Sequence, residues 1–148
     1  MSHSFVQPEE IQHTLANHID YVAKRFEDFL HANGSKGKAT NYVWCLGEGS
    51  ILGGIEFWPH ADPNEDPISI TIDLRPRMGS VRYIAKIAHP ALPSVKPILD
   101  RENPVGLSED EVSVVDRLTA GIRDELLAQL VQIASGRSDI FTQGEPNQ

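Results

Sequence analysis

The residues with the most obvious chemical potential lie in one acidic, proline-bounded segment, PHADPNEDP, at residues 59–67. It carries three carboxylates, Asp62, Glu65 and Asp66, and one imidazole, His60. Such a group could bind a hard cation or perform general acid–base catalysis. The segment lacks the glycine of a calcium-binding loop, an H-E-x-x-H spacing and a second histidine close by. We therefore interpret it as a solvated acidic loop, and we expect no metal and no cofactor.

Nucleophilic chemistry would fall to Cys45 or to a serine, with His60 or His89 as the base. The sequence has no G-x-S-x-G elbow, and Cys45 lies within a predicted strand, where a buried, inert thiol is the common case. The glycines of GEGS and of Gly53-Gly54 are not followed by a helix, as a phosphate-binding loop requires. We predict no catalytic residue, so an enzyme is disfavoured.

Composition narrows the classes of partner. The 148 residues include 13 Lys and Arg against 21 Asp and Glu, a net charge of −8. This charge repels nucleic acid and anionic membranes, and it attracts a basic protein. The single cysteine allows no internal disulfide, the first ten residues do not resemble a signal peptide, and no apolar run approaches the roughly 20 residues of a membrane span. We expect a soluble, cytoplasmic protein with neither nucleic acid nor membrane as a partner.

Two amphipathic helices are predicted near the ends of the chain. The first begins at Pro8, which suits a first helical turn, and ends at Gly34. The second begins at a capping box formed by residues 108–111, Ser-Glu-Asp-Glu, and ends at Gly136. Apolar residues recur every three or four positions in both helices, as in a helix with one buried side. The two stripes are Ile11, Leu15, Ile19, Val22, Phe26, Phe29 and Leu30, and Val112, Val115, Leu118, Ile122, Leu126, Leu130 and Ile133.

Four strands are predicted between the helices, at residues 41–46 and 51–58 and in a hairpin at residues 68–88. The glycines within the second strand indicate either a bulge or a close approach by another backbone. The hairpin alternates apolar and polar residues. A four-residue loop at residues 76–79 would place Asp73 opposite Arg82, as an ion pair, and would pair three buried couples. These couples are Ile72 with Tyr83, Ile70 with Ala85 and Ile68 with Ile87.

The predicted fold is α+β, a four-stranded antiparallel meander with the long N-terminal helix and the C-terminal helix on one face. Residues 1–136 form one domain, and residues 137–148 form a polar C-terminal tail whose Ile140 and Phe141 either dock or fray. Four prolines predict an extended crossing segment at residues 89–107. The opposite sheet face is open to solvent or to a partner, and it carries Ser69, Thr71, Asp73, Arg75, Arg82 and Lys86.

We place Tyr42 and Trp44 in the core, which leaves the open face without the aromatic residues of an RNA-binding sheet. The favoured hypothesis is a small acidic protein-binding module that occludes or escorts a basic partner protein, as a toxin-neutralising immunity protein or a secretion chaperone does. In this hypothesis Trp58 and neighbouring apolar groups supply affinity, and the charges of Asp62, Glu65 and Asp66 accelerate association. The predicted partner-binding residues are Trp58, His60, Asp62, Glu65, Asp66, Asp73, Arg75 and Arg82.

Two alternatives remain open. The first is a small-ligand-binding or enzymatic domain with a pocket between the sheet and the helices. The residues expected to line that pocket are Trp44, Tyr83, Cys45 and His60. The second alternative is a homodimer that forms through an edge strand or through the open face of the sheet.

Overall fold

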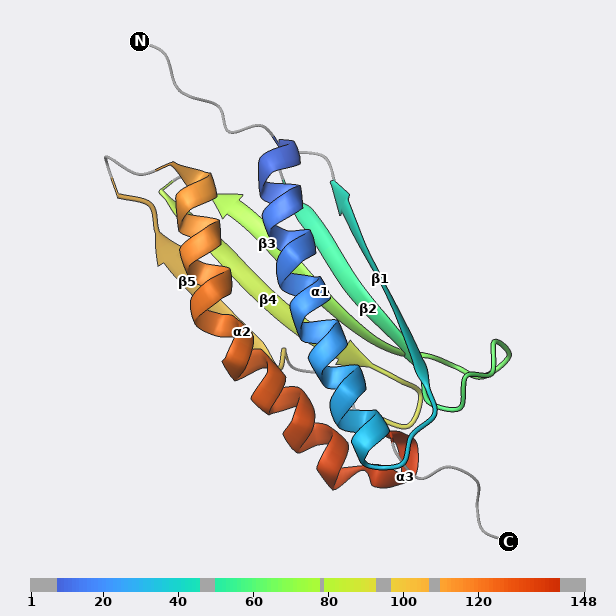
Figure 1. Ribbon diagram of the computed structural model, residues 1–148. Coiled ribbons are helices and arrows are strands. Elements are labelled where there is room, and N and C mark those ends of the chain that lie inside the picture. Colours follow the sequence, from blue (N-terminus) through green and yellow to red (C-terminus); the bar gives the residue numbers. More distant parts are fainter. Residues whose placement is uncertain (1–7, 46–49, 78, 93–96, 107–109, 142–148) are drawn as a thin grey trace, which may run out of the picture.

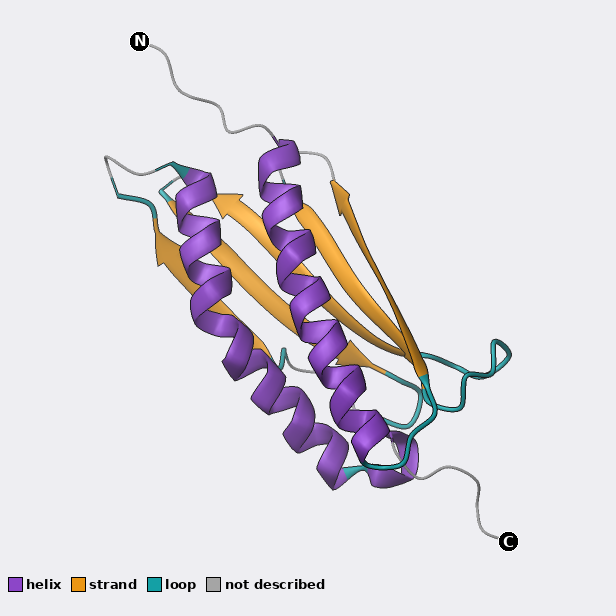
Figure 2. Ribbon diagram, viewed as in Figure 1, coloured by secondary structure: helices purple, strands orange, loops and turns teal. Residues whose placement is uncertain are grey.

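The chain folds as one antiparallel sheet with two long helices packed on one of its faces (Figure 1, Figure 2). The computed structural model describes residues 8–45, 50–77, 79–92, 97–106 and 110–141. The strands follow one another in sequence order: β1 (Lys38–Cys45), β2 (Ile51–Trp58), β3 (Ile68–Arg77), β4 (Ser80–Ala88) and β5 (Leu99–Pro104). The helices are α1 (Pro8–Ala32), α2 (Glu111–Gly136) and the short α3 (Ser138–Phe141). The fold is therefore α+β.

Helix α1 forms as its apolar spacing predicts. Its stripe faces the sheet, and Phe29, at the margin of the stripe, is half buried. Gly34 has a φ of 100°, a left-handed conformation that glycine adopts without strain. The N–H of Ser35 then donates to the Leu30 carbonyl at 2.9 Å, which closes the end of the helix. The fully buried members of the stripe are Ile11, Leu15, Ile19, Val22, Phe26 and Leu30.

Helix α2 begins two residues later than the predicted capping box would place it. Asp110 is the N-cap, and its carboxylate accepts a hydrogen bond from the backbone N–H of Ser113 at 2.8 Å. The prediction of Ser108 as the N-cap is therefore wrong, and residues 107–109 lie outside the described part of the chain. The apolar spacing of the helix is confirmed, since Val115, Leu118 and Leu126 are buried against the sheet or α1.

The prediction of four strands is also wrong, because residues 99–104 pair with β4 as a fifth strand. The prolines of this region flank the strand: Pro97 precedes it and Pro104 is its last residue. Strand β5 lies at the edge of the sheet, where only one side of the backbone needs ladder partners. Prolines at the ends of an edge strand cost little stability, so the number of prolines in this region does not exclude a strand.

The hairpin of β3 and β4 has a two-residue loop instead of the predicted four. Arg77 pairs with Ser80, and Gly79 has a φ of 80°. The observed partners are Ile72 with Ala85 and Ile70 with Ile87, so the predicted register is wrong by two residues. A register shift of two residues leaves each side chain on the same face of the sheet. The predicted division into a buried face and an open face is therefore unaffected by the error.

The core fills the space between the sheet and the helices. The register of β1, β2 and β3 runs through Gly53 without a bulge, and a Cβ atom at Gly53 would overlap the Ile19 side chain of α1. The predictions of a bulge and of a close approach by another backbone are therefore both wrong, because side chains fill the space beside these glycines. Helix α3 completes this core: Ile140 and Phe141 are buried, and the Phe141 ring meets that of Phe26 at 6.0 Å between centroids.

Candidate functional site

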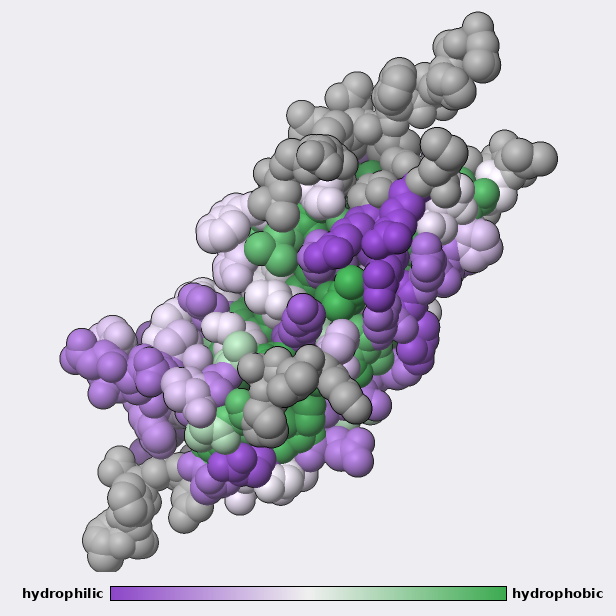
Figure 3. Space-filling model, turned by 180° about the vertical axis from the view of Figure 1, so that it is seen from behind, coloured by the Kyte–Doolittle hydropathy of each residue, from purple (hydrophilic) through white to green (hydrophobic). Residues whose placement is uncertain are grey.

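The face of the sheet that points away from α1 and α2 is here named the outer face. Figure 3 views the molecule from that side, and strongly hydrophilic residues form a band over the β3, β4 and β5 part of it. No described helix covers this face (Figure 1). Alternation along the strands assigns to it Thr40, Tyr42, Trp44, Leu52, Glu56, Trp58, Ser69, Thr71, Asp73, Arg75, Ser80, Arg82, Ile84, Lys86, Asp100 and Glu102.

The arginines of the outer face are held by carboxylates. Arg75 donates through Nε and Nη2 to Asp73 at 3.0 and 2.8 Å, along the same strand. Arg82 makes a two-point contact with Asp100 of β5, at 3.0 and 2.7 Å. The predicted pair of Asp73 with Arg82 is wrong, because the true register sets Asp73 opposite Ile84. Both guanidinium groups are already engaged, so this part of the face offers little to a phosphate.

The ion pairs also set the protonation of these groups. The hydrogen bond from Arg82, reinforced by its positive charge, holds the pKa of Asp100 below its ordinary value. The hydrogen bond and charge of Asp73 raise the pKa of Arg75. The surface that these side chains form is therefore a set of arginine–carboxylate pairs.

The β1 side of the outer face carries an aromatic pair instead. The rings of Tyr42 and Trp44 lie 4.6 Å apart between centroids, inclined by 31°, and Trp44 is 57% exposed. Tyr42 lies over Gly54, where any Cβ atom would overlap its ring. Burial, aided by the negative charge of Glu56, raises the pKa of Tyr42. The prediction that Tyr42 and Trp44 belong to the core is therefore wrong.

Trp58 ends β2 on the outer face, and the acidic loop of residues 59–67 begins directly after it and projects beyond the sheet (Figure 1). The Glu65 carboxylate organises this loop. It accepts hydrogen bonds from the backbone N–H groups of His60 at 2.8 Å and Asp62 at 3.3 Å, and it contacts the His60 ring at 2.8 Å. Ala61 adopts a left-handed φ of 55° at the turn. Glu65 thus builds the loop and is only partly available to a partner.

Burial acts to raise the pKa of Glu65, but the hydrogen bonds from His60 and Asp62 outweigh it, so the pKa lies below its ordinary value. The other two carboxylates of the loop, Asp62 and Asp66, are exposed. Asp62 also accepts the Asn64 N–H at 2.9 Å. Within the described residues, no three His, Cys, Asp or Glu side chains are grouped closely enough to hold a metal ion. The loop therefore presents negative charge on a self-supported backbone.

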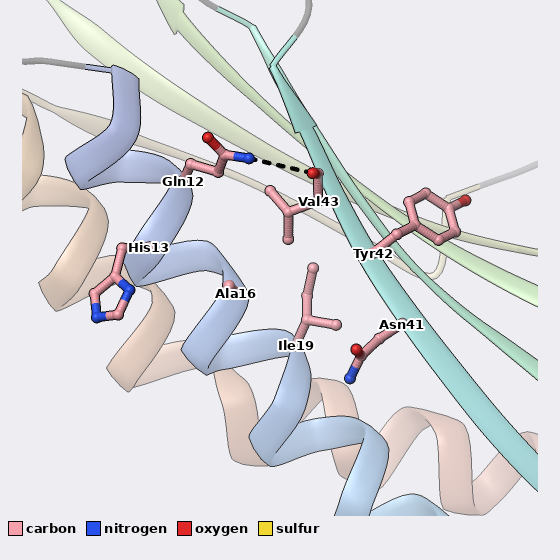
Figure 4. Close-up of a pocket in the computed structure, with 7 residues that line it drawn as sticks. All are labelled: Gln12, His13, Ala16, Ile19, Asn41, Tyr42 and Val43. Atoms are coloured by element: carbon pink, nitrogen blue, oxygen red, sulfur yellow. Dashed lines mark hydrogen bonds between the residues drawn. The ribbon is translucent and has the colours of Figure 1, made fainter.

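A groove of about 420 Å³ lies between α1 and the edge strand β1 (Figure 4). The Gln12 amide crosses it and donates to the Val43 carbonyl at 3.3 Å, while Glu27 accepts the N–H of Ala39 at 2.9 Å. These α1 side chains form hydrogen bonds with backbone groups of β1 that would otherwise be available to pair with another chain. Nothing in the apolar spacing of α1 distinguishes Gln12 and Glu27 as partners of a strand, so sequence reasoning missed this groove.

The pocket imagined between sheet and helices does not form from its predicted residues. Tyr83 is fully buried on the helix-covered face, Trp44 lies on the outer face, and His60 lies in the acidic loop. The side chain of Cys45 lies outside the described part of the chain. The eight predicted partner-binding residues are instead brought to two places: Asp73, Arg75, Arg82 and Trp58 to the outer face, and His60, Asp62, Glu65 and Asp66 to the loop beside it.

Comparison with protein-family models, with curated proteins and with solved structures finds no match for this chain. None of the described helices combines the length and the apolar character needed to cross a membrane.

Proposed function

We propose that this chain is a small acidic protein-binding module of the cytoplasm, which occludes or escorts a partner protein as immunity proteins and secretion chaperones do. The observation that carries the proposal is the aromatic pair on the outer face. Trp44 is the exposed large hydrophobic residue of the described chain, and it is stacked on Tyr42 where no described helix covers the sheet. Tryptophan and tyrosine are enriched among the residues that dominate binding energy at protein interfaces.

The charge of the chain supports a basic partner. The net charge is −8, and the arginines of the outer face are neutralised by Asp73 and Asp100. Asp62 and Asp66 are exposed on the projecting loop, which directly follows Trp58 in the chain. Such charges speed the encounter with an oppositely charged surface more than they tighten the final complex. In this proposal Trp44, Tyr42 and Trp58 supply affinity and the loop supplies steering.

The test begins with capture of the partner from the native host and its identification by mass spectrometry. Association is then measured at low salt for Asp62→Asn/Asp66→Asn and for the matched control Asp20→Asn/Asp28→Asn. Each variant removes two exposed charges, but the control pair lies on α1. We expect the loop variant alone to associate several-fold more slowly, and Trp44→Ala to dissociate faster. Equal association rates for the two charge variants, with no effect of Trp44→Ala, would remove the proposal.

The alternative, a small-ligand-binding or enzymatic domain, is supported by the groove between α1 and β1. Its lining combines the amides of Gln12 and Asn41 with the imidazole of His13. Screening of small polar fragments by amide chemical shifts separates the two readings. Saturable shifts confined to this groove favour the alternative, and shifts centred on Trp44 favour the protein-binding surface.

A further inference from the structure

Helices α1 and α2 lie side by side on the face of the sheet opposite the outer face (Figure 1). Residues of both helices line a second groove, of about 170 Å³. Exposed Asn17 and Asp116 lie at its rim, and buried His18 and Thr119 lie at its floor. At ~30 Å³ per molecule, the groove has room for about six waters or for one small ligand. Two of the residues that line it, His18 and Arg123, each have a buried nitrogen, Nδ1 and Nε respectively, with no hydrogen-bond partner in the described part of the chain.

The first of these nitrogens is a donor. The hydroxyl of Tyr83 lies 2.6 Å from Nε2 of His18. Tyr83 is fully buried, and in the described part of the chain its hydroxyl has no other acceptor, so its proton is donated to Nε2. A neutral imidazole carries one N–H, which must therefore be on Nδ1. Burial, together with the positive charge of Arg123, lowers the pKa of His18 to about 4, so the ring is neutral at pH 7.

The second nitrogen belongs to an arginine without a carboxylate. The guanidinium carbon of Arg123 lies 4.2 Å from the ring centre of Tyr21, and that of Arg25 lies 3.8 Å from the same centre. Within the described residues neither arginine forms an ion pair, whereas Arg82 and Arg101 each contact a carboxylate. The Tyr21 hydroxyl donates to Asp124 at 3.3 Å, which orients the ring. Two cations thus meet at one ring in a strongly acidic protein.

We propose that this groove binds a small ligand bearing an oxyanion, a carboxylate or a phosphate group, whose oxygens accept hydrogen bonds from Arg123 and from Nδ1–H of His18. Arg123 is only partly buried and lines the groove. Nδ1–H of His18 and Nε–H of Arg123 both lack an acceptor among the described residues. An anion with several oxygens can accept hydrogen bonds from both donors. The site lies on the far side from the aromatic pair, so it stands or falls independently of the protein-binding proposal.

The test uses sodium acetate and inorganic phosphate as separate probes, each compared with sodium chloride at the same ionic strength. Proton–nitrogen spectra of the wild-type protein report on Nε–H of Arg123 and Nδ1–H of His18. We expect a saturable shift of both signals with at least one probe, while Nε–H of Arg137, which is paired with Asp139, stays unchanged. A response to acetate, to phosphate or to both distinguishes a carboxylate ligand, a phosphate ligand or a general oxyanion site.

A second readout is the thermal midpoint, which a ligand of the folded state raises. The probe that shifts the Arg123 signal should raise the midpoint of the wild type and of Arg101→Gln, the charge-matched control, and should leave Arg123→Gln unchanged. If no signal shifts saturably, or if Arg123→Gln responds as the control does, water alone fills the groove and the proposal is overturned. The wild-type spectra decide the matter even if Arg123→Gln does not fold.

Discussion

The two faces of the sheet are made by the same strands and have opposite characters. On the helix-covered face, Ile68, Ile70, Ile72 and Leu74 of β3 have no exposed surface. On the outer face, the same strand presents Thr71, Asp73 and Arg75, and β1 presents the exposed Trp44. Period-two alternation thus separates stability from surface chemistry within a single segment. Substitutions at neighbouring residues can therefore test the two roles separately.

The largest effect is expected from truncating the helix-covered face. Ile72→Ala removes a fully buried side chain and should lower the free energy of unfolding by about 2–5 kcal/mol. Thr71→Ala, one residue earlier and on the outer face, should change it by no more than about 0.5 kcal/mol. Urea denaturation of both variants measures the difference. Similar losses for the two would show that the outer face is packed against something else in solution.

The buried pair of His18 and Tyr83 makes the helix-covered side sensitive to acid. The pKa of His18 is lowered from 6.5 to about 4 in the folded protein, so between these pH values the unfolded chain binds the extra proton. Stability should be unaffected above about pH 6.5 and should fall by about 3 kcal/mol as the pH drops to about 4. His18→Gln should lose this part of the pH dependence. An identical slope in both proteins, measured by denaturation at each pH, would contradict the burial of a neutral His18.

Two adjacent glycines of β2 sharpen the comparison. Gly53→Ala directs a Cβ into Ile19 within the core, so we expect a loss of about 1–3 kcal/mol from overpacking. Gly54→Ala directs its Cβ into the Tyr42 ring on the outer face, which can swing into solvent. That variant should lose less stability and should change the fluorescence of Trp44 by separating the stacked rings. A greater loss of stability for Gly54→Ala would place the aromatic pair in a rigid core.

The smallest effect is expected in the acidic loop. Glu65→Gln weakens the acceptor of the His60 and Asp62 N–H groups, so these two amides should exchange with solvent faster while the global stability hardly changes. Asp66→Asn removes the same charge from an exposed neighbour and serves as the control. Hydrogen exchange followed by NMR measures both variants. Unchanged exchange in Glu65→Gln would show that Glu65 does not organise the loop.

The sequence predicts which face of the sheet each side chain occupies more reliably than it predicts which residues of neighbouring strands are paired. Alternation in β3 assigned Ile70, Ile72 and Leu74 to the core whatever the exact register, because a shift of two residues conserves the face. The turn was misplaced because Pro76 was read as a turn residue. Pro76 lies beyond the last β2–β3 pair, Ile51 with Leu74, so its missing N–H leaves no ladder bond unmade.

The candidate site was harder to predict. In the centre of β1 both faces carry apolar residues, with Val43 between Tyr42 and Trp44, so periodicity alone cannot show which face is buried. The choice is made by β2: Val43 pairs with Gly53 beneath α1, and Tyr42 fills the space over Gly54. The loop residues were found from their charge, but the role of Glu65 depends on backbone N–H groups that composition does not reveal.

The most direct test of the central claim, that the outer face is the working surface, is photo-crosslinking in the native host. A photoreactive amino acid is placed at position 44 on the outer face or at position 24, which is exposed on α1. We expect a covalent adduct with one partner protein from position 44 and none from position 24. Adducts from position 24, with none from position 44, would contradict the assignment of the outer face as the binding surface.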